Sequence, residues 1–397
     1  MANDREFLDL TYINDRVNVL EPLGWKLEKI QSAWIMVIGA GALGNEVLKN
    51  LALIGVGNIF LIDFDIVEHT NLARSILYRE EDCTGDQLKV EVAARRIKEL
   101  NPDINVVTLN GDVSVEVGWG VFRRMDAIIS CVDNRLARLF VNRIAHRLGK
   151  SWIDGGILDL GGQMNVFEPG VSCYECQLSE RAWQNIHFRM GCANRAMRYA
   201  SSGQANTIPI TASIIGAIQV QEAFRIISSD DGRSKLANKQ VYYEGLSSTF
   251  ELLPASRLKP RCDSHQSIGA ITEATDLSFK MKVSDVLAWL KEHFDDPGLV
   301  IALDHTLIME VASERTGKKM ELLRPRPLLH DSDYADLMED DADSMMVTQK
   351  TAEIGDDFPH GDKTLEEIGI PPLHILTLYT KGDRQFVELT GDRSLIF

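Results

Sequence analysis

Short apolar runs alternate with longer, helically spaced segments over the first two thirds of the chain. Five of the runs are too short for buried helices and predict strands, at residues 34–38, 58–62, 105–109, 127–131 and 163–167. In the longer segments the apolar positions recur every three or four residues, which predicts helices at residues 45–53, 87–100, 135–148 and 214–227. This alternation predicts an α/β domain with a mostly parallel sheet covered on both faces.

A different pattern begins after His265 and predicts a second, smaller α+β unit over residues 273–397. Its clearest signals are a helix at Val283–His293 and strands near residues 299–303 and 375–379. The first 30 residues mix charged and apolar positions and predict an N-terminal helical segment. The sequence therefore divides into residues 1–30, 31–265 and 273–397.

Composition places the chain among soluble globular proteins. Its 397 residues are 45% hydrophobic and 25% charged, which suits two or three domains with a sizeable core. The formal net charge of −16 repels nucleic acids and anionic membrane surfaces, so neither is an expected partner. We find no signal peptide and no apolar run of membrane-spanning length, and six cysteines suit a reducing compartment. We therefore expect a cytoplasmic protein, with a solvated acidic loop from His330 to Asp343.

Two pairs of metal-ligand residues lie far apart in the sequence. Cys173 and Cys176 form the first pair, and Cys262 and His265 form the second. A single Cys-x-x-Cys pair can be a redox pair or a coincidence. Three thiolates and an imidazole, however, are the tetrahedral ligand set of a structural zinc site. We therefore expect zinc, against the alternative of four unrelated residues.

A glycine turn follows the first predicted strand. Gly39, Gly41 and Gly44 have the G-x-G-x-x-G spacing that lets a backbone approach phosphates at a helix N-terminus. Asp63 ends the next strand, where its carboxylate can accept hydrogen bonds from ribose hydroxyls. Alone, this pattern favours a nicotinamide-dependent dehydrogenase.

The charged residues that follow favour a different chemistry. Asp65, Asn71 and Arg74 come soon after the second strand, Lys89 lies further on, and Asp133 follows a later strand. Cationic side chains can neutralise a triphosphate, and a carboxylate at a strand end can hold Mg²⁺. A hydride-transfer site needs none of them. Each alone could be a surface ion pair, but together they indicate a site for a nucleoside triphosphate.

In order and spacing these motifs resemble the ThiF/MoeB/ubiquitin-activating enzyme family, from about Arg16 to His265. Further matches are Asn101-Pro102, Gly162–Phe167 and Ile215–Ala223. The resemblance implies a Rossmann-like adenylation domain at residues 31–265. It also implies an activity: enzymes of this family use ATP and Mg²⁺ to adenylate the C-terminal glycine of a ubiquitin-like or sulfur-carrier protein. His265 departs from the family, because a cysteine usually takes that place, but zinc accepts either ligand.

The resemblance also implies a role for each matched residue. It assigns Asp63 to the ribose, Asp133 to Mg²⁺, and Arg16 to the active site of the other subunit in a homodimer. The residues it assigns to the phosphates are Asn71, Arg74 and Lys89.

Cys192 is the candidate nucleophile for a second step. It lies in residues 177–208, which in this family form a loop crossing over the substrate tail. Its basic neighbours Arg189 and Arg195 favour a thiolate. Cys83 and Cys131 are expected to be structural. The family's usual threonine–cysteine pair is absent, so an inert Cys192 stays open as an alternative.

Residues 363–379 resemble the end of a ubiquitin-like fold, which implies a C-terminal ubiquitin-fold domain that recruits a conjugating enzyme. An unrelated dimerisation domain is the alternative. The preferred function is therefore that of a compact bacterial-type activating enzyme for a ubiquitin-like protein, with a thioester on Cys192. The first alternative is a sulfur-carrier adenylyltransferase that forms no thioester, and the second is an inactive adenylation fold that serves as a scaffold.

Overall fold

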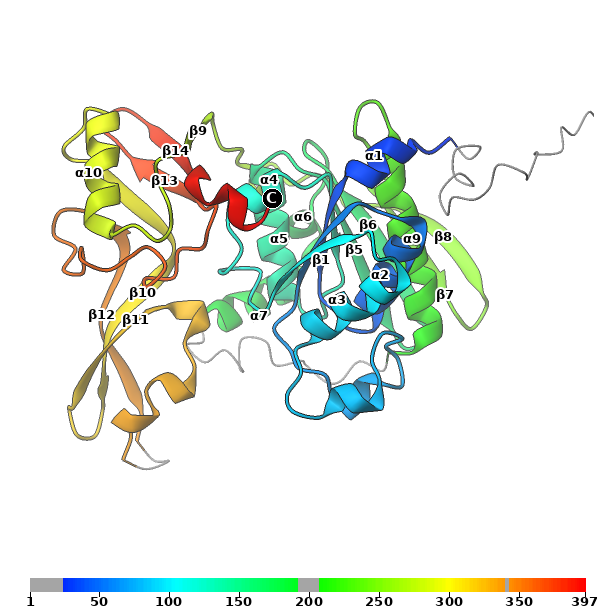
Figure 1. The fold of residues 1–397 in the computed structure, drawn as a ribbon, viewed down its shortest axis with the longest axis horizontal. Coiled ribbons are helices and arrows are strands. Elements are labelled where there is room, and N and C mark those ends of the chain that lie inside the picture. The colour runs from blue at the N-terminus through cyan, green and yellow to red at the C-terminus, as the bar shows by residue number, and fades with distance from the viewer. Residues whose placement is uncertain (1–23, 192–206, 340–342) are drawn as a thin grey trace, which may run out of the picture.

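The computed structural model describes residues 24–191, 207–339 and 343–397, which form two sheet domains side by side (Figure 1). Arg16 and Cys192 lie outside the described residues. The N-terminal segment is described from Gly24 onward and contributes helix α1 (Leu27–Ser32).

The first domain contains an eight-stranded sheet in the order β3-β2-β1-β4-β5-β6-β7-β8. The strands are β1 (Trp34–Ile38), β2 (Asn58–Ile62), β3 (Asn105–Leu109), β4 (Ala127–Ser130), β5 (Trp152–Leu158), β6 (Gly161–Phe167), β7 (Lys239–Glu244) and β8 (Thr249–Pro254). Strands β1 to β5 pair in parallel, and β5 to β8 pair antiparallel. The predicted α/β fold with a mostly parallel sheet is confirmed. Three of these strands, β5, β7 and β8, were not predicted, because their polar and glycine residues break the apolar pattern.

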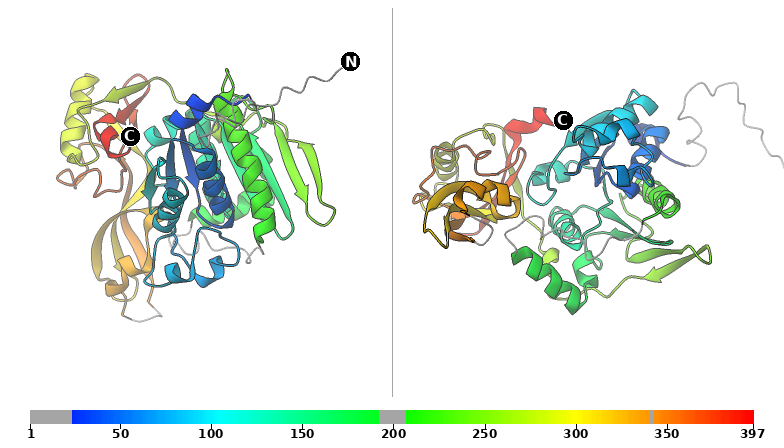
Figure 2. Two further views of the ribbon diagram at one scale, coloured as in Figure 1. Left: turned by 45° about the vertical axis from the view of Figure 1, so that its right-hand side comes forward. Right: turned by 90° about the horizontal axis from the view of Figure 1, so that it is seen from below.

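Helices cover both faces of this sheet (Figure 2). One face carries α2 (Ala42–Ile54), α3 (Lys89–Leu100) and α9 (Pro209–Ser228), and the other carries α4 (Trp119–Arg123) and α5 (Arg135–Arg147). Alternate residues of β1 enter the two cores: Ile35 and Val37 pack under α2, whereas Met36 and Ile38 face α5. Strand β1 is therefore buried on both sides, as its continuous apolar run predicts.

Helix α9 is the one helix of the described chain that is long and apolar enough to cross a membrane, with a mean hydropathy of 1.2. It packs against α2 and β5, and 61% of its most apolar 18-residue stretch is buried within the protein. It therefore has the surroundings of a core helix, as expected from its apolar composition.

The second domain is a mixed sheet with one helix across it. Its elements are β9 (Ile271–Ala274), α10 (Val283–His293), β10 (Val300–Ser313), β11 (Lys319–Pro325), β12 (Met345–Ile354), β13 (Ile375–Tyr379) and β14 (Arg384–Leu389). The first and last strands, β9 and β14, pair in parallel. Strand β13 lies between β14 and β10, the strand that follows the helix. This arrangement shows a second sheet domain, and the ubiquitin-fold assignment stays a prediction.

The acidic stretch from His330 to Asp343 is not a wholly solvated loop. Short 3-10 helices cover its described part, at Asp331–Asp333 and Ala335–Leu337. Leu337 is buried in a small cluster with Ile308 and Val311 of β10. Leu337, together with the partly buried Tyr334 and Met338, fixes the segment to the sheet, and the charge pattern alone did not reveal these contacts.

The two domains share one hydrophobic core. Leu373 and Ile375 of the second domain belong to the same buried cluster as Trp119 and Phe122 of α4. Gly120 is required at this contact, because a Cβ there would lie 2.5 Å from the carbonyl oxygen of Leu373. The C-terminal domain is therefore packed onto the first domain as tightly as an interior layer.

A buried carboxylate fixes this junction. Glu388 of β14 is 0% exposed, and its two oxygens accept hydrogen bonds from Arg123 and Arg124 beside α4. Glu273 of β9 pairs with the outer edge of Arg123 and is 45% exposed. The junction thus combines an enclosed ion pair with a peripheral one.

We expect Glu388→Ala to lower the free energy of unfolding by about 3–5 kcal/mol, because two arginines lose the partner they have in the buried junction. Glu273→Ala is the matched control and should cost less than about 1 kcal/mol, since that pair is exposed. Urea denaturation of both variants measures the difference. Equal losses would show that the enclosed pair does not hold the domains together.

Candidate active site and metal centre

Three parallel strands of the first domain end at one edge of the sheet, where sheets of this kind form a ligand-binding crevice. Strand β1 lies between β2 and β4, so the carboxyl ends of all three meet at the same edge of the sheet. The chain passes from β1 to β2 on one side and later to β4 on the other, which makes this the switch point of the sheet. Gly39, Asp63 and Asp133 each follow one of these strands.

The glycine turn is shaped by close backbone contacts. Gly39 has a φ of 97°, and a Cβ there would lie 2.9 Å from the carbonyl oxygen of Cys131. A Cβ on Gly44 would lie 1.9 Å from the carbonyl oxygen of Gly39. A Cβ on Gly41 would meet no atom within 4 Å, so this part of the turn faces open space. The turn is thus enclosed by backbone at Gly39 and Gly44 and open at Gly41, where a phosphate could approach the start of α2.

Two side chains that the sequence did not single out hold the turn. The carbonyl oxygen of Ala40 accepts hydrogen bonds from Tyr78 Oη at 2.6 Å and from Asn45 Nδ2 at 2.7 Å. Tyr78 comes from the segment between β2 and α3 and is buried. No sequence signal marked Tyr78, because its partner is a backbone atom.

Asp63 also supports the turn. Its Oδ2 accepts the Ala40 N–H at 2.6 Å, and its Oδ1 accepts the Asp65 N–H at 2.8 Å. Burial raises the pKa of Asp63, whereas the positive charge of Lys89 lowers it. Each carboxylate oxygen keeps a second lone pair, so Asp63 can also accept from a ribose hydroxyl.

Lys89 is the buried cation of the crevice. Its Nζ donates to Asp65 Oδ2 at 2.8 Å, and the side chain is only 10% exposed. Burial lowers the pKa of Lys89, but the negative charges of Asp63 and Asp65 outweigh burial and leave that pKa raised. The ammonium therefore stays charged and is held beside the glycine turn.

Asn71 and Arg74 lie on the segment that follows β2. Asn71 is buried, and its Oδ1 accepts the Glu68 N–H at 3.0 Å, so it also shapes the local turn. Arg74 is half-buried, and among the described residues its guanidinium has no hydrogen-bond or ion-pair partner. Arg74 is thus a cation with its charge available for a ligand.

Asp133 is exposed beyond the end of β4, in the position that the strand pattern predicted. The next residue, Asn134, caps α5 by accepting the Ala137 N–H at 2.8 Å. The structure thus brings the glycine turn, Asp63, Asp65 and Lys89 together at the strand ends that Asp133 also follows, whereas Asn71 and Arg74 are placed only on the neighbouring segment after β2. A carboxylate ligand for Mg²⁺ and two cations for phosphates are the groups that bound MgATP would need.

The two metal-ligand pairs meet beside α6 (Tyr174–Gln177). The Sγ of Cys173 lies 3.8 Å from that of Cys176 and 3.6 Å from that of Cys262. The Sγ of Cys176 lies 3.6 Å from Nε2 of His265, and all four ligand atoms lie within 4.8 Å of one another. A tetrahedron with Zn–S bonds of about 2.3 Å has edges of roughly 3.8 Å, so the four residues fit a closed zinc site.

Helix α5 holds both metal loops. Asn142 Oδ1 accepts the Tyr174 N–H at 3.0 Å, and its Nδ2 donates to Ser264 Oγ at 2.8 Å. Arg143 pairs with Glu175 at 3.2 Å. The helix that begins beside Asp133 thus also positions the metal ligands.

Residues 16–264, more than half of the chain, match the ThiF family. The chain belongs to the ThiF family. The match spans the glycine turn, the charged crevice and three of the four metal-ligand residues, and it ends one residue before His265.

Two relatives illustrate the range of the ThiF family. SUMO-activating enzyme subunit 2 of Dictyostelium discoideum is 35% identical over 163 residues, which cover 40% of this chain and 24% of that protein. Sulfur carrier protein adenylyltransferase of Thermus thermophilus is 29% identical over 244 residues, which cover 59% of this chain and 83% of that protein. The chain thus spans about a quarter of the first relative and most of the second.

A solved ThiF-type fold is similar in structure. The crystal structure of E. coli MccB with ATP has a TM-score of 0.52 and 22% sequence identity, covering 64% of this chain and 75% of that chain. At this identity the likeness shows the adenylation fold alone.

We expect the purified protein to contain about one zinc ion per chain, because a closed four-ligand site binds zinc tightly and contributes to folding. Cys173→Ser and His265→Ala should lose the metal and lower the thermal midpoint. Cys83→Ser, outside the cluster, is the matched control and should keep it. Elemental analysis and thermal unfolding measure both effects; wild type free of zinc after purification without chelator would contradict the assignment.

Proposed function

We propose that this protein uses MgATP to adenylate the C-terminal carboxylate of a ubiquitin-like or sulfur-carrier protein. The observation that carries the proposal is the set of charges in the crevice. A buried ammonium, Lys89, is held beside an open glycine turn in a ThiF-family fold, and Arg74, on the segment after β2, has a guanidinium without a partner among the described residues. Membership of the family supports the reaction, and the crevice supplies groups suited to a triphosphate.

The reaction is a displacement at the α-phosphorus. A carboxylate oxygen of the carrier forms a bond to that phosphorus, the bond to the bridging oxygen breaks, and pyrophosphate leaves. A carboxylate is a weak nucleophile, so the enzyme must lower the repulsion between anions and hold the reacting atoms in line. Lys89, Asn71 and Arg74 would bind the phosphates, and Asp63 would bind the ribose. Mg²⁺, held by Asp133, would neutralise phosphate charge.

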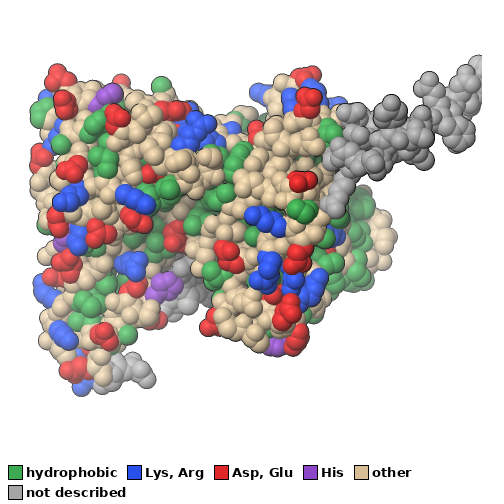
Figure 3. All heavy atoms as spheres, viewed as in Figure 1, with side chains coloured by type: hydrophobic (Ala, Val, Ile, Leu, Met, Phe, Trp, Pro, Cys, Tyr) green, Lys and Arg blue, Asp and Glu red, His purple; other side chains and the backbone are tan. Residues whose placement is uncertain are grey.

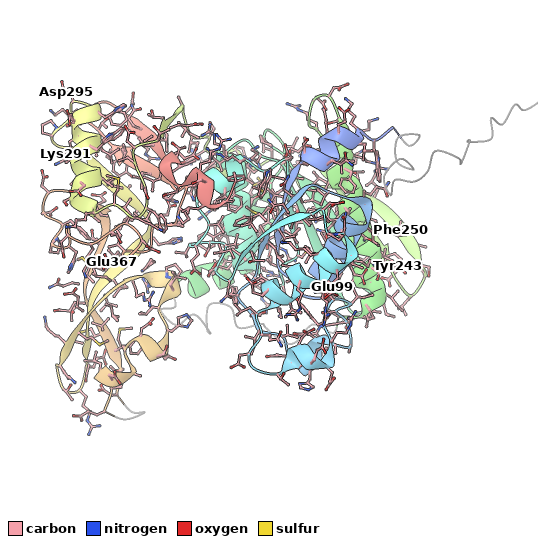
Figure 4. All side chains as sticks on the ribbon, in the orientation of Figure 1. Glu99, Tyr243, Phe250, Lys291, Asp295 and Glu367 are labelled. Carbon is pink, nitrogen blue, oxygen red and sulfur yellow. The ribbon has the colours of Figure 1, made fainter. Side chains whose placement is uncertain are left out.

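An apolar surface supports a protein as the second substrate. Hydrophobic side chains gather over β7 and β8 at the right-hand edge of the molecule in Figure 3. Exposed apolar residues there and on the β5–β6 turn are Leu158, Leu160, Leu246, Phe250 and Leu252. Tyr243 and Phe250 lie together on the hairpin, with ring centroids 4.9 Å apart (Figure 4). Apolar patches of this kind are typical of protein-binding surfaces.

The remaining cysteines favour Cys192 as the residue that would take the activated carrier. Of the six cysteines, Cys173, Cys176 and Cys262 belong to the metal cluster. Burial raises the pKa of Cys131, and desolvation with the charges of Glu80 and Asp82 raises that of Cys83. None of these five suits a reactive thiolate. We infer that the thiolate of Cys192 would attack the acyl carbon of the adenylate, form a thioester and release AMP.

We propose that the C-terminal domain is the docking site for a conjugating enzyme. We also propose a homodimer in which Arg16 of each subunit enters the active site of the other. A sulfur-carrier adenylyltransferase without the thioester step is the alternative. The Thermus thermophilus relative favours that alternative, because the match covers most of its length. Arg74 and Lys89 weigh against an inactive scaffold, because Lys89 keeps its charge beside the glycine turn and Arg74 is present with a guanidinium that has no partner among the described residues.

Asp133→Asn should reduce ATP–pyrophosphate exchange at least about 100-fold, because the lost carboxylate would no longer hold Mg²⁺. The assay contains a ubiquitin-like protein ending in glycine. Asp103→Asn, an exposed carboxylate at the other end of the sheet, is the control and should exchange at the wild-type rate. Exchange at the wild-type rate in Asp133→Asn would remove Asp133 from the proposal.

Cys192→Ala should keep pyrophosphate exchange and lose a thiol-sensitive adduct with the carrier, because adenylation uses the crevice alone. Cys83→Ala is the control and should retain the adduct. Gel mobility with and without dithiothreitol reports it. An adduct that persists in Cys192→Ala places the nucleophile elsewhere, and no adduct in wild type favours the sulfur-carrier alternative. Deleting the C-terminal domain is a poor test of transfer, because it would expose the shared core around Trp119 and Phe122.

A further inference from the structure

Strands β4 and β5 separate directly below Asp133. Their parallel ladder ends at the pair Ser130 and Asp154, and β5 then continues along β6. Beyond this pair no ladder joins the facing edges of β4 and β5, so carbonyls on those edges have no ladder partner. Unpaired carbonyls at a partly buried site are costly, so another group must satisfy them.

Arg138 of α5 donates hydrogen bonds to main-chain carbonyls just beyond the end of the ladder. Its Nη2 donates to the carbonyl oxygen of Val132 at 2.6 Å and to that of Gly155 at 3.0 Å. Its Nε donates to Asp154 Oδ1 at 2.9 Å. One planar guanidinium thus bridges the two strand ends, with a side chain that is 15% exposed.

Gln219 of α9 forms a second bridge from the opposite face. Its Nε2 donates to the carbonyl oxygens of Ser130 at 3.0 Å and Ile153 at 3.4 Å. This bridge lies within the paired part of the strands, one step before the separation. Of the two bridges, Arg138 is the one that reaches the peptide leading into Asp133.

We propose that Arg138 is a positioning residue that sets the direction of the Asp133 carboxylate. It fixes the Val132 carbonyl, which belongs to the peptide bond directly before Asp133, and Asp133 itself is exposed. A carboxylate on an unfixed strand end would sample many directions and bind a divalent cation weakly. The inference rests on the proposed function only in that Asp133 is taken to hold the cation.

Lysine cannot replace this arginine. Lys at position 138 would keep a positive charge, but its ammonium is a single point and lacks the planar fork that reaches three acceptors. A role confined to charge predicts that Arg138→Lys behaves like wild type, and a role confined to folding predicts a lower thermal midpoint with unchanged Mn²⁺ affinity of the folded protein. A positioning role predicts that Arg138→Lys fails even when the fold is intact.

The test compares wild type, Arg138→Lys and Asp133→Asn as full-length proteins, with Lys98→Arg on the surface of α3 as control. Mn²⁺ affinity is measured by electron paramagnetic resonance with a non-hydrolysable ATP analogue present. Metal-free affinity for the same analogue and the thermal midpoint are measured separately. Arg138→Lys should weaken Mn²⁺ binding about tenfold or more, as the loss of an outer-shell partner does at metal sites. Its nucleotide affinity without metal should stay within about twofold of wild type, since Asp133 does not contact the nucleotide in this proposal.

Three results would overturn the inference: unchanged Mn²⁺ affinity in Arg138→Lys, an equal loss of metal-free nucleotide affinity, or wild-type affinity in Asp133→Asn. The binding assay contains no carrier protein. A wild type that binds the metal and nucleotide through Arg138 and Asp133, yet exchanges no pyrophosphate, would therefore contradict the proposed function and leave this inference standing.

Discussion

The parallel pairing of β1 with β2 on one side and β4 on the other is the constraint on which the candidate site depends. It brings three carboxyl ends to one edge, so that a glycine turn, a carboxylate pair and Asp133 meet although they are far apart in sequence. The pairing is secured by cores on both faces and by the missing side chain of Gly39, which lets the turn lie against the backbone after β4. A side chain at Gly39 would push the two strand ends apart.

Helix α5 connects the crevice to the metal cluster. Its N-terminal cap lies next to Asp133, its second turn bears Arg138, and its last turns hold both metal loops through Asn142 and Arg143. The metal-ligand cluster and the strand end that leads to Asp133 are therefore attached to the same helix. Zinc bound by these four residues would tie two distant loops to this helix and so limit how far the helix can shift, and with it the end of β4.

The sequence was sufficient for four of the five parallel strands, β1 to β4, because buried strands and amphipathic helices leave strong apolar patterns. Strand β5 was missed because Asp154, Gly155 and Gly156 interrupt its apolar run. The sequence also predicted the metal cluster and the charged crevice, since these depend on residue types with few other uses. It did not reveal the contacts of Tyr78, Arg138 and Gln219, because their main-chain carbonyl partners leave no sequence pattern. Strand β8 was missed as well, because all six of its residues are exposed and no buried face imposes alternation.

The enclosed Glu388 constrains the motion of the C-terminal domain. Swinging this domain away would separate the carboxylate from Arg123 and Arg124 and wet the core that the domains share. A cost of about 3 kcal/mol leaves fewer than roughly one molecule in a hundred open at any moment. A partner bound to this domain would stay at a nearly constant distance from the crevice. Any transfer of an activated carrier to that partner would therefore require movement of the partner itself or of loops. By the same reasoning, a chimera that borrows this domain from a relative would also need that relative's α4.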